Sequence, residues 1–498
     1  MGIIKRLAAF MTAAVCVMCT CAVPNAAAVD DDFEMPSGRT WGAAKALLEK
    51  EKTWENPGDP SYAVCVFRGD EVLWTKINGF IDCENNIAAD EDSVYEWGSI
   101  SKTFTWVSVM QLWEQGKIDL DADVRTYLPD GFFKNLRYDD PITMLNIMNH
   151  QGGWCENTYT ADVWDEADIL PLGDALRATE PAQTYRPGEY TSYSNWGAAL
   201  AAYIVELVSG TEYVEYVHEN ILEPLGMEHT SISANHRDNE WVRTQREKMK
   251  SYTLGLVLDD DSVNYESIGT YMSYDLIYPC GSVTGTIGDL TTYAQSFVDE
   301  SHPLFQNAET QQKLFSGSAF YGSSDIPTTS YGFIAVEHKV RTYGHSGLTW
   351  ACTADMEFDL ESKTGVVMLS NVRGDLPDWA NNIVFGSHLD GDKYPESEPE
   401  HMTIDGYFVS TRLTAGGILK AMVYLDAMDF SQISDLYKIG DDLYQMYDPE
   451  NPSSYTALVG ETRHSDGSSW ICWSPMGTEI PALSCVSAVW KSSAPVMW

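Results

Sequence analysis

Periodic hydrophobic positions divide the chain into two strand-rich stretches with a long helical stretch between them. Residues 41–52 have the spacing of a helix, and residues 62–67 and 72–77 have the composition of two strands around a turn at 68–70. From about residue 102 to residue 298 the pattern is mostly helical, interrupted by loops rich in Gly and Pro. The first part of the chain is therefore predicted to be an antiparallel hairpin that leads into a helical block.

Strand patterns return after the helical block, at 331–340, 349–358 and 366–369. The stretches 341–344 and 360–365 have the composition of turns. Because strand groups lie on both sides of the helical block, we expect one sheet assembled from both ends of a domain. This arrangement predicts an α+β fold.

The first 28 residues have the organisation of a secretory signal. Two basic residues precede an apolar run at 7–23, and small residues at 26–28 offer a cleavage site. The run is short, and no later stretch approaches the ~18 consecutive apolar residues that a membrane-spanning helix needs. We expect cleavage near Ala28 and a secreted or extracytoplasmic protein without a membrane span.

The rest of the chain is predicted to form a main domain at 29–390 and a small C-terminal accessory module at 391–498. The stretch 386–400 is rich in Asp, Glu, Gly and Pro, which is typical of a linker. Beyond it, strand and turn patterns alternate around a short helix at 415–425, without a spacing that indicates catalysis.

Charge excludes several classes of partner. The 498 residues include 31 Lys and Arg against 73 Asp and Glu, which gives a formal net charge of −42. Proteins bind nucleic acid and anionic lipid surfaces through clustered Lys and Arg, so we expect neither as a partner. Solubility in an extracellular or salty medium accounts for this acidity without a specific ligand.

Cysteine usage indicates neither a disulfide scaffold nor a metal site. Seven of the ten cysteines follow residue 28, and they are too sparse for a disulfide framework, although Cys472 and Cys485 are close enough to pair across a hairpin. The same part of the chain contains neither Cys-x-x-Cys nor His-Glu-x-x-His. We therefore expect no metal and no other cofactor.

The first candidate for chemistry is Ser99-Ile100-Ser101-Lys102, which opens an amphipathic segment at 103–115. In a helix Ser99 and Lys102 lie one turn apart on the same face, and N–H groups at the helix start favour negative charge there. A serine hydroxyl needs a neighbouring base, and a lysine can serve where burial or another cation lowers its pKa. Taken alone, the spacing also fits an N-cap serine and a solvated lysine.

Two further stretches could complete a site. Tyr193-Ser194-Asn195 offers a phenol that can act as general acid or base and an amide that can hold a substrate carbonyl. His345-Ser346-Gly347 precedes an apolar strand, where the N–H groups of Leu348 and Ser99 could form an oxyanion hole. Each stretch by itself also fits an ordinary turn that packs on the core.

These three motifs, in this order, resemble those of the class C β-lactamase and DD-peptidase superfamily of penicillin-recognising serine hydrolases. The likeness extends over about residues 43–371 and includes the stretches 96–104, 150–153 and 224–230. It implies a β-lactamase/transpeptidase-like fold, in which an antiparallel sheet flanked by helices lies beside an all-helical region. The site is then expected in the cleft between them.

The resemblance also implies roles for individual residues. Ser99 is expected to be the nucleophile, and Lys102 and Tyr193 are expected to shuttle its proton. Substrate binding is assigned by the same resemblance to five residues: Asn195, His345, Ser346, Gly347 and Leu348.

The chain departs from the family pattern at the third motif. Most β-lactamases of this type have Lys-Thr-Gly where His345-Ser346-Gly347 stands, and that lysine helps to hold the substrate carboxylate. A histidine with a reference pKa of ~6.5 is mostly neutral at pH 7, so the resemblance favours the DD-peptidase, D-aminopeptidase and esterase branches. A literal Lys363-Thr364-Gly365 lies between two strands, and we interpret it as a hairpin turn remote from the cleft.

The sequence therefore predicts a secreted serine hydrolase that forms an acyl-enzyme with amide, ester or lactam carbonyls. Its substrates are expected to be small molecules or peptides, with peptidoglycan stem peptides and β-lactams as candidates. The alternative is a penicillin-binding sensor or scaffold that is acylated without turnover. The loops at 154–167 and 233–272, which would shape the cleft, carry no readable pattern.

Overall fold

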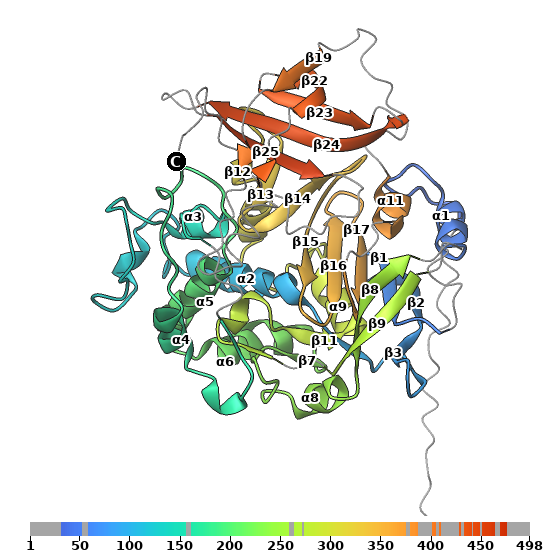
Figure 1. Cartoon of the computed structure of the whole chain (residues 1–498), viewed down its shortest axis with the longest axis horizontal. Helices are drawn as coiled ribbons and strands as arrows, with labels where there is room; N and C mark the ends of the chain where they lie inside the picture. Colours follow the sequence, from blue (N-terminus) through green and yellow to red (C-terminus); the bar gives the residue numbers. More distant parts are fainter. Residues whose placement is uncertain are drawn as a thin grey trace, which may run out of the picture.

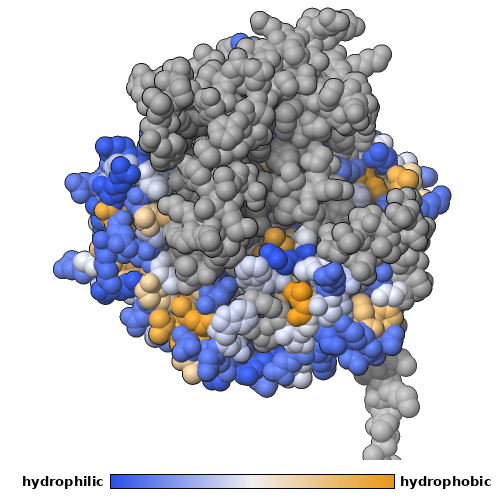
Figure 2. Space-filling view, viewed as in Figure 1, coloured by the Kyte–Doolittle hydropathy of each residue, from blue (hydrophilic) through white to orange (hydrophobic). Residues whose placement is uncertain are grey.

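The computed structural model describes residues 31–475 apart from short gaps, at 52–57, 156–160, 258–262, 271–272, 375–378, 387–400, 405–407, 410–427, 430–432, 441, 449–450 and 464–468. The predicted signal at 1–28, the helix at 415–425 and Cys485 lie outside these residues. In the described ranges, no helix combines the length and the apolar character that a membrane crossing requires. On the face drawn in Figure 2, most of the described surface is hydrophilic, with small hydrophobic patches between.

An eight-stranded antiparallel sheet forms the centre of the molecule (Figure 1). Its strands, in spatial order, are β12 (Ala319–Phe320), β13 (Pro327–Ser330), β14 (Phe333–Glu337), β15 (Arg341–Leu348), β16 (Thr353–Asp359), β17 (Thr364–Ser370), β1 (Tyr62–Arg68) and β2 (Glu71–Asn78). The N-terminal strand β1 pairs along its whole length with β17. The predicted sheet built from both ends of a domain is confirmed, as is the hairpin of β1 and β2.

The turn predicted at 341–344 is wrong, because these residues begin strand β15 and pair with β14. Thr342 is fully buried there, and its hydroxyl donates to Glu357 on the neighbouring strand at 2.8 Å. A polar residue tolerates burial when a partner satisfies its hydrogen bond, and hydropathy alone cannot show that partner. In consequence the third motif lies inside β15 and does not precede a strand.

Helices cover both faces of the sheet. Alternate residues of β1 explain this, because Ala63, Cys65 and Phe67 join the core under α9 (Ile287–Ser296), whereas Val64 and Val66 face the opposite way. The second face is covered by α1 (Trp41–Leu48), shorter than predicted, and α11 (Trp379–Phe385). A strand buried on both sides needs apolar residues at every position.

A helical region lies beside the sheet, and helix α2 (Ser101–Glu114) runs between the two. Its helices, with those around it, are α3 (Met144–Met148), α4 (Leu172–Ala178), α5 (Asn195–Ser209), α6 (Tyr213–Val217), α7 (Glu223–Leu225), α8 (Glu240–Arg246) and α10 (Ala308–Leu314). Helix α2 packs against α5 and is buried on every side from Ser101 to Leu112. The predicted helix is present, but the prediction that it is amphipathic is wrong. A helix enclosed by sheet and helices presents no face to water.

Strands interrupt the predicted helical block. Those inside it are β6 (Asp162–Val163) with β10 (Tyr274–Asp275), β7 (Thr230–Ser231) with β11 (Thr284–Thr286), and the longer pair β8 (Ser251–Val257) and β9 (Val263–Gly269). Outside the block, β3 (Phe80–Asp82) pairs with β4 (Ile87–Ala88), β5 (Val94–Glu96) joins β11, and β18 (Val372–Arg373) joins β8. The strands of two or three residues carry too little alternation to be recognised in the sequence.

The described part of the C-terminal region is built from strands. Five of them form an antiparallel sheet, in the order β19 (His401–Ile404), β22 (Ile433–Gly440), β23 (Leu443–Asp448), β24 (Asn451–Arg463) and β25 (Ser469–Pro475). A separate pair consists of β20 (Phe408–Val409) and β21 (Met428–Asp429). Figure 1 shows the five-stranded sheet in red, beside β12 and β13 at the edge of the central sheet.

A hairpin turn connects β16 and β17 as predicted, but it ends at Lys363, because Thr364 and Gly365 already pair with β16. Lys363 has a positive φ of 58° at the end of this turn, and Thr364 opens β17. The Lys363 ammonium pairs with Glu300. This lysine therefore belongs to the surface of the sheet.

Truncation of a buried side chain where β1 pairs with β17 should destabilise the whole domain. For Phe67→Ala we expect a loss of about 3–5 kcal/mol in the free energy of unfolding, because Phe67 is fully buried and its ring fills the space over Gly365. The control Val72→Ala, at a position 49% exposed on β2, should change it by less than about 0.5 kcal/mol. Urea denaturation measures the free energy of unfolding of both variants. An equally small loss in Phe67→Ala and Val72→Ala would contradict the packing described for Phe67.

Candidate active site

Ser99 lies in a tight turn that connects a strand to the buried helix α2. Strand β5 ends at Glu96, and the 3₁₀ turn Gly98–Ile100 leads into α2. Gly98 has a φ of +53°, and a Cβ there would lie 2.7 Å from the backbone nitrogen of Leu348 on β15. Only glycine therefore fits at this position, because the backbone is left-handed and the neighbouring strand is in contact. The Ser99 side chain is held 6% exposed against β15.

Lys102 lies in the first turn of α2 and is fully buried. Its Nζ donates to Ser99 Oγ at 2.9 Å and to the carbonyl oxygen of Cys280 at 2.6 Å. The ring of Tyr193 lies with its centroid 4.9 Å from the same nitrogen. The structure thus brings Ser99, Lys102 and Tyr193 together, although Tyr193 is distant from the other two in the sequence.

The Tyr193 segment is held on both sides by His150. The Ser192 N–H donates to the backbone oxygen of His150 at 2.7 Å, and the Ser194 N–H donates to its Nδ1 at 3.2 Å. The rings of His150 and Tyr193 are in contact, with centroids 4.2 Å apart and planes tilted by 32°. Sequence reasoning placed His150 in a family-like stretch but gave it no role. The His150 imidazole therefore packs against the Tyr193 ring and helps to hold it in position.

Asn195 is the first residue of helix α5 and is 8% exposed. The preceding residue, Ser194, caps the helix, since its Oγ accepts from the Gly197 N–H at 3.0 Å. This cap fixes where the helix begins. It thereby places Asn195 directly after Tyr193 and Ser194 at the end of a rigid element.

The third motif lies on β15, directly against the turn that carries Ser99. A Cβ on Gly347 would come within 1.9 Å of the Trp97 carbonyl oxygen and 2.9 Å of the Ser99 nitrogen. Gly98 approaches Leu348 in the same way, so two glycines allow two backbones to touch. The N–H groups of Ser99 and Leu348 consequently belong to neighbouring backbone segments, as an oxyanion hole requires.

His345 is 3% exposed on β15. Its Nδ1 donates to the backbone oxygen of Ser346 at 2.6 Å, and its ring centroid lies 6.3 Å from that of Tyr193. Burial, together with the neighbouring Lys102 ammonium, lowers the pKa of His345 to about 3. His345 is therefore neutral at pH 7. Within the described ranges its Nε2 is buried and takes part in no hydrogen bond.

Two opposed carboxyl groups, which sequence reasoning missed, lie behind the lysine. Asp162 and Asp275 are directly paired across β6 and β10. Asp275 accepts from the Ile277 N–H at 2.9 Å and from the Cys280 thiol at 3.2 Å, and so holds the loop whose Cys280 carbonyl meets Lys102. Burial and the Asp162 charge raise the pKa of Asp275 to about 7, although Lys102 acts against them. Two-residue strands gave no signal for this pair.

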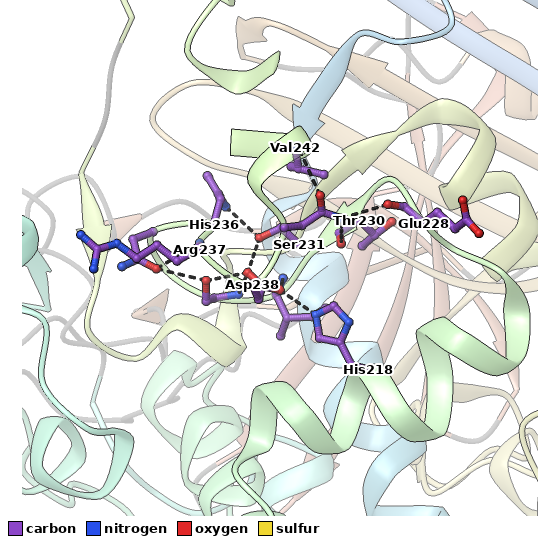
Figure 3. Close-up of polar contacts among 12 residues, drawn as sticks. His218, Glu228, Thr230, Ser231, His236, Arg237, Asp238 and Val242 are labelled. Carbon is purple, nitrogen blue, oxygen red and sulfur yellow. Dashed lines mark hydrogen bonds and ion pairs between the residues drawn. The ribbon is translucent and has the colours of Figure 1, made fainter. Parts of the chain in front are cut away.

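A second group of Ser, His and Asp, shown in Figure 3, has the wrong geometry for a nucleophile. Asp238 accepts from Ser231 Oγ at 2.7 Å and from His218 Nε2 at 2.8 Å, whereas it is His236 whose Nδ1 lies 3.3 Å from the serine. In a catalytic triad the carboxylate orients the histidine that contacts the serine. Ser231 is also fully buried. The group anchors β7, which pairs with β11 beside β5.

A buried ion pair stabilises the same small sheet at the strand that leads to Ser99. Arg246 is fully buried on α8, and its guanidinium donates to Glu96 Oε1 at 2.7 and 2.9 Å. The pKa of the Glu96 carboxyl is lowered despite its burial, because the Arg246 charge favours the ionised form. Across the described residues, no cluster of three or more His, Cys, Asp or Glu could hold a metal ion.

Comparison with known proteins agrees with this geometry. The profile of the family described as Beta-lactamase matches residues 51–386. The chain belongs to the β-lactamase family. It is 24% identical over 353 residues to penicillin-binding protein 4* of Bacillus subtilis, a match that covers 67% of this chain and 74% of that protein.

Solved structures show the same fold. The octameric penicillin-binding protein homologue from Pyrococcus abyssi has a TM-score of 0.54 at 20% identity, covering 86% of this chain and 97% of that one. The D-amino acid amidase from Ochrobactrum anthropi has a TM-score of 0.53 at 17% identity, covering 66% and 91%. The fold is β-lactamase/transpeptidase-like, and this member of the β-lactamase family is a serine hydrolase.

Asp275 should make the stability of the protein depend on pH. Its pKa is higher in the folded than in the unfolded chain, so the protonated carboxyl favours folding and this contribution is lost as pH rises toward and through 7. Asp275→Asn resembles the protonated form. Between pH 5 and pH 8 we expect the variant to gain on the wild type by about 2 kcal/mol in unfolding free energy.

Urea denaturation at several pH values measures this difference. Asp168→Asn, at an exposed carboxyl in the same part of the chain, is the matched control and should show no such trend. A constant difference between Asp275→Asn and wild type from pH 5 to pH 8 would show that Asp275 does not titrate in this range.

Proposed function

We propose that this protein is an exported hydrolase that cleaves amide or ester bonds through an acyl-enzyme on Ser99. The observation that carries the proposal is the 2.9 Å hydrogen bond between Lys102 Nζ and Ser99 Oγ, made by a fully buried lysine. A buried amine beside a hydroxyl, with the ring of Tyr193 next to the amine, is suited to accept the proton that the hydroxyl loses on attack.

In the first half of the reaction Ser99 Oγ attacks the substrate carbonyl, and its proton passes to the Lys102 and Tyr193 pair. The N–H groups of Ser99 and Leu348 bind the oxyanion. Tyr193 returns the proton to the leaving amine or alcohol as the carbonyl–heteroatom bond breaks. Asn195 orients the substrate from the start of α5.

In the second half a water molecule attacks the ester carbon of the acyl-enzyme. Its proton passes to the same pair of side chains, and Ser99 Oγ recovers a proton as the acid product leaves. Atoms balance as one water consumed for each bond cleaved, and no cofactor takes part.

The environment of His345 supports amide or ester substrates over those held by a free carboxylate. A neutral imidazole attracts a carboxylate less strongly than an ammonium does. The likeness to the D-amino acid amidase is consistent with this preference. Peptidoglycan stem peptides and β-lactams are the alternative candidate substrates.

The leader at 1–28, with its basic start, apolar run and small residues before Val29, supports export. The formal charge of −42 is compatible with a soluble extracellular protein. N-terminal sequencing of the protein secreted by its host is expected to begin near Val29.

Ser99→Ala should remove hydrolysis and labelling together. Purified protein is assayed with p-nitrophenyl esters, D-amino acid amides, D-alanyl-D-alanine peptides and nitrocefin, and with a fluorophosphonate probe. We expect a loss of at least about 1,000-fold in turnover, because no other group can form the acyl-enzyme. The control Ser209→Ala, at the far end of α5, should retain wild-type rates.

Intact-mass measurements separate turnover from simple acylation. A transient adduct on Ser99 that decays during steady turnover supports the hydrolase. A burst followed by a permanent adduct would favour a sensor or scaffold, and retained turnover in Ser99→Ala would exclude the assignment of the nucleophile.

A further inference from the structure

The C-terminal region contacts the central domain through backbone, at the turn between β12 and β13. Gly322 in this turn has a φ of +51°, and a Cβ there would lie 2.7 Å from the Asp442 oxygen. On the other side, a Cβ on Gly460 of β24 would lie 2.5 Å from the Gly322 nitrogen. The Ser323 hydroxyl adds a hydrogen bond to Asp442 at 3.3 Å. The contact therefore depends on two glycines that face each other.

The residues at this contact are as buried as those of a protein core. Glu461, next to Gly460, is 3% exposed, and its N–H donates to the Asp442 oxygen at 2.8 Å. Tyr444 and Tyr321 are each 2% exposed at the same place. Figure 1 shows the C-terminal sheet lying along β12 and β13. Close backbone approach and buried aromatic rings are typical of a fixed interface.

The same hairpin continues inward to the helical region through Asn149. The amide of Asn149 donates to the Ser318 backbone oxygen at 3.1 Å, and its Oδ1 accepts from the hydroxyls of Ser318 at 2.5 Å and Thr329 at 3.2 Å. Asn149 is 3% exposed. One side chain thus ties Ser318, directly before β12, and Thr329 of β13 to the end of helix α3.

The residue after Asn149 is His150, which brackets Tyr193. His150 has a φ of +54°, an uncommon conformation for a residue with a side chain. It is kept there by its neighbours, because its backbone oxygen and Nδ1 accept from Ser192 and Ser194 on either side of the tyrosine. A shift of Asn149 would therefore move the His150 ring that packs against Tyr193.

We propose that the C-terminal module is a positioning element for Tyr193, which it holds through the β12–β13 hairpin, Asn149 and His150. This inference rests on the proposed function, in which Tyr193 carries the proton to and from Ser99. The module thereby takes part in the reaction without a group at the reacting atoms. The loss of its docking should slow proton transfer and leave substrate affinity nearly unchanged.

Gly460→Ala in the full-length chain tests the docking. Gly460 lies in a β-strand outside the left-handed region, so alanine fits the strand itself and conflicts only with the backbone of the hairpin. We expect kcat and the rate of fluorophosphonate labelling of Ser99 to fall by about 10-fold, with KM changed less than about 2-fold. The control Gly58→Ala, where a Cβ would meet nothing within 4 Å, should behave as wild type.

A double-mutant cycle with Asn149→Ala tests the connection. If both act through one path, each single variant lowers kcat and the double variant is little worse than either. Additive losses, or wild-type rates in Gly460→Ala, would overturn the proposal. Ser323→Ala, which removes only the hydroxyl that donates to Asp442, gives a milder loss of kcat in the same direction should Gly460→Ala fail to fold. Wild-type kcat in Ser323→Ala would then overturn the proposal.

Failure of the proposed function has a different signature. If wild-type protein is neither labelled at Ser99 nor active on any substrate, the hydrolase assignment falls, and the positioning role falls with it. If the wild type is labelled and active while Gly460→Ala equals it, only the positioning role is lost.

Discussion

The burial of one amine determines how the rest of this site is built. Lys102 is enclosed on every side, and a polar group removed from water must be compensated by hydrogen bonds. The Cys280 carbonyl and the Ser99 hydroxyl supply that compensation. The loop from Asp275 to Cys280, the turn at Gly98 and the start of α2 all serve to keep these two oxygen atoms in place.

The groups around the lysine are arranged so that few full charges compete with it. His345 is neutral, and Asp275 lies between its charged and neutral forms at pH 7. The formal charges that do occur near the nucleophile, on Glu96 and Arg246, neutralise each other within one buried pair. Small changes in the ionisation of Asp275 are therefore felt at Lys102, because little water screens the interaction.

The sequence predicted the sheet and the three motifs because both rest on local patterns. A continuous apolar run of six residues identified β1, and residue order alone identified Ser99, Lys102 and Tyr193 as candidates. It could not predict that Thr342 and its neighbours form a strand, since a distant carboxylate satisfies the buried threonine. Asp162 and Asp275 were missed for the same reason, because their pairing joins positions more than a hundred residues apart.

The pairing of β1 with β17 also constrains how the chain reaches its final form. Tyr62 lies opposite Ser370, so the first strand of the sheet finds its inner neighbour only after some three hundred further residues have been synthesised. Closing so large a loop is slow, and until it closes an apolar strand is left without a partner on one edge. A newly made chain must therefore be shielded from its own copies, and early termination of translation before residue 370 yields a product that cannot complete its core.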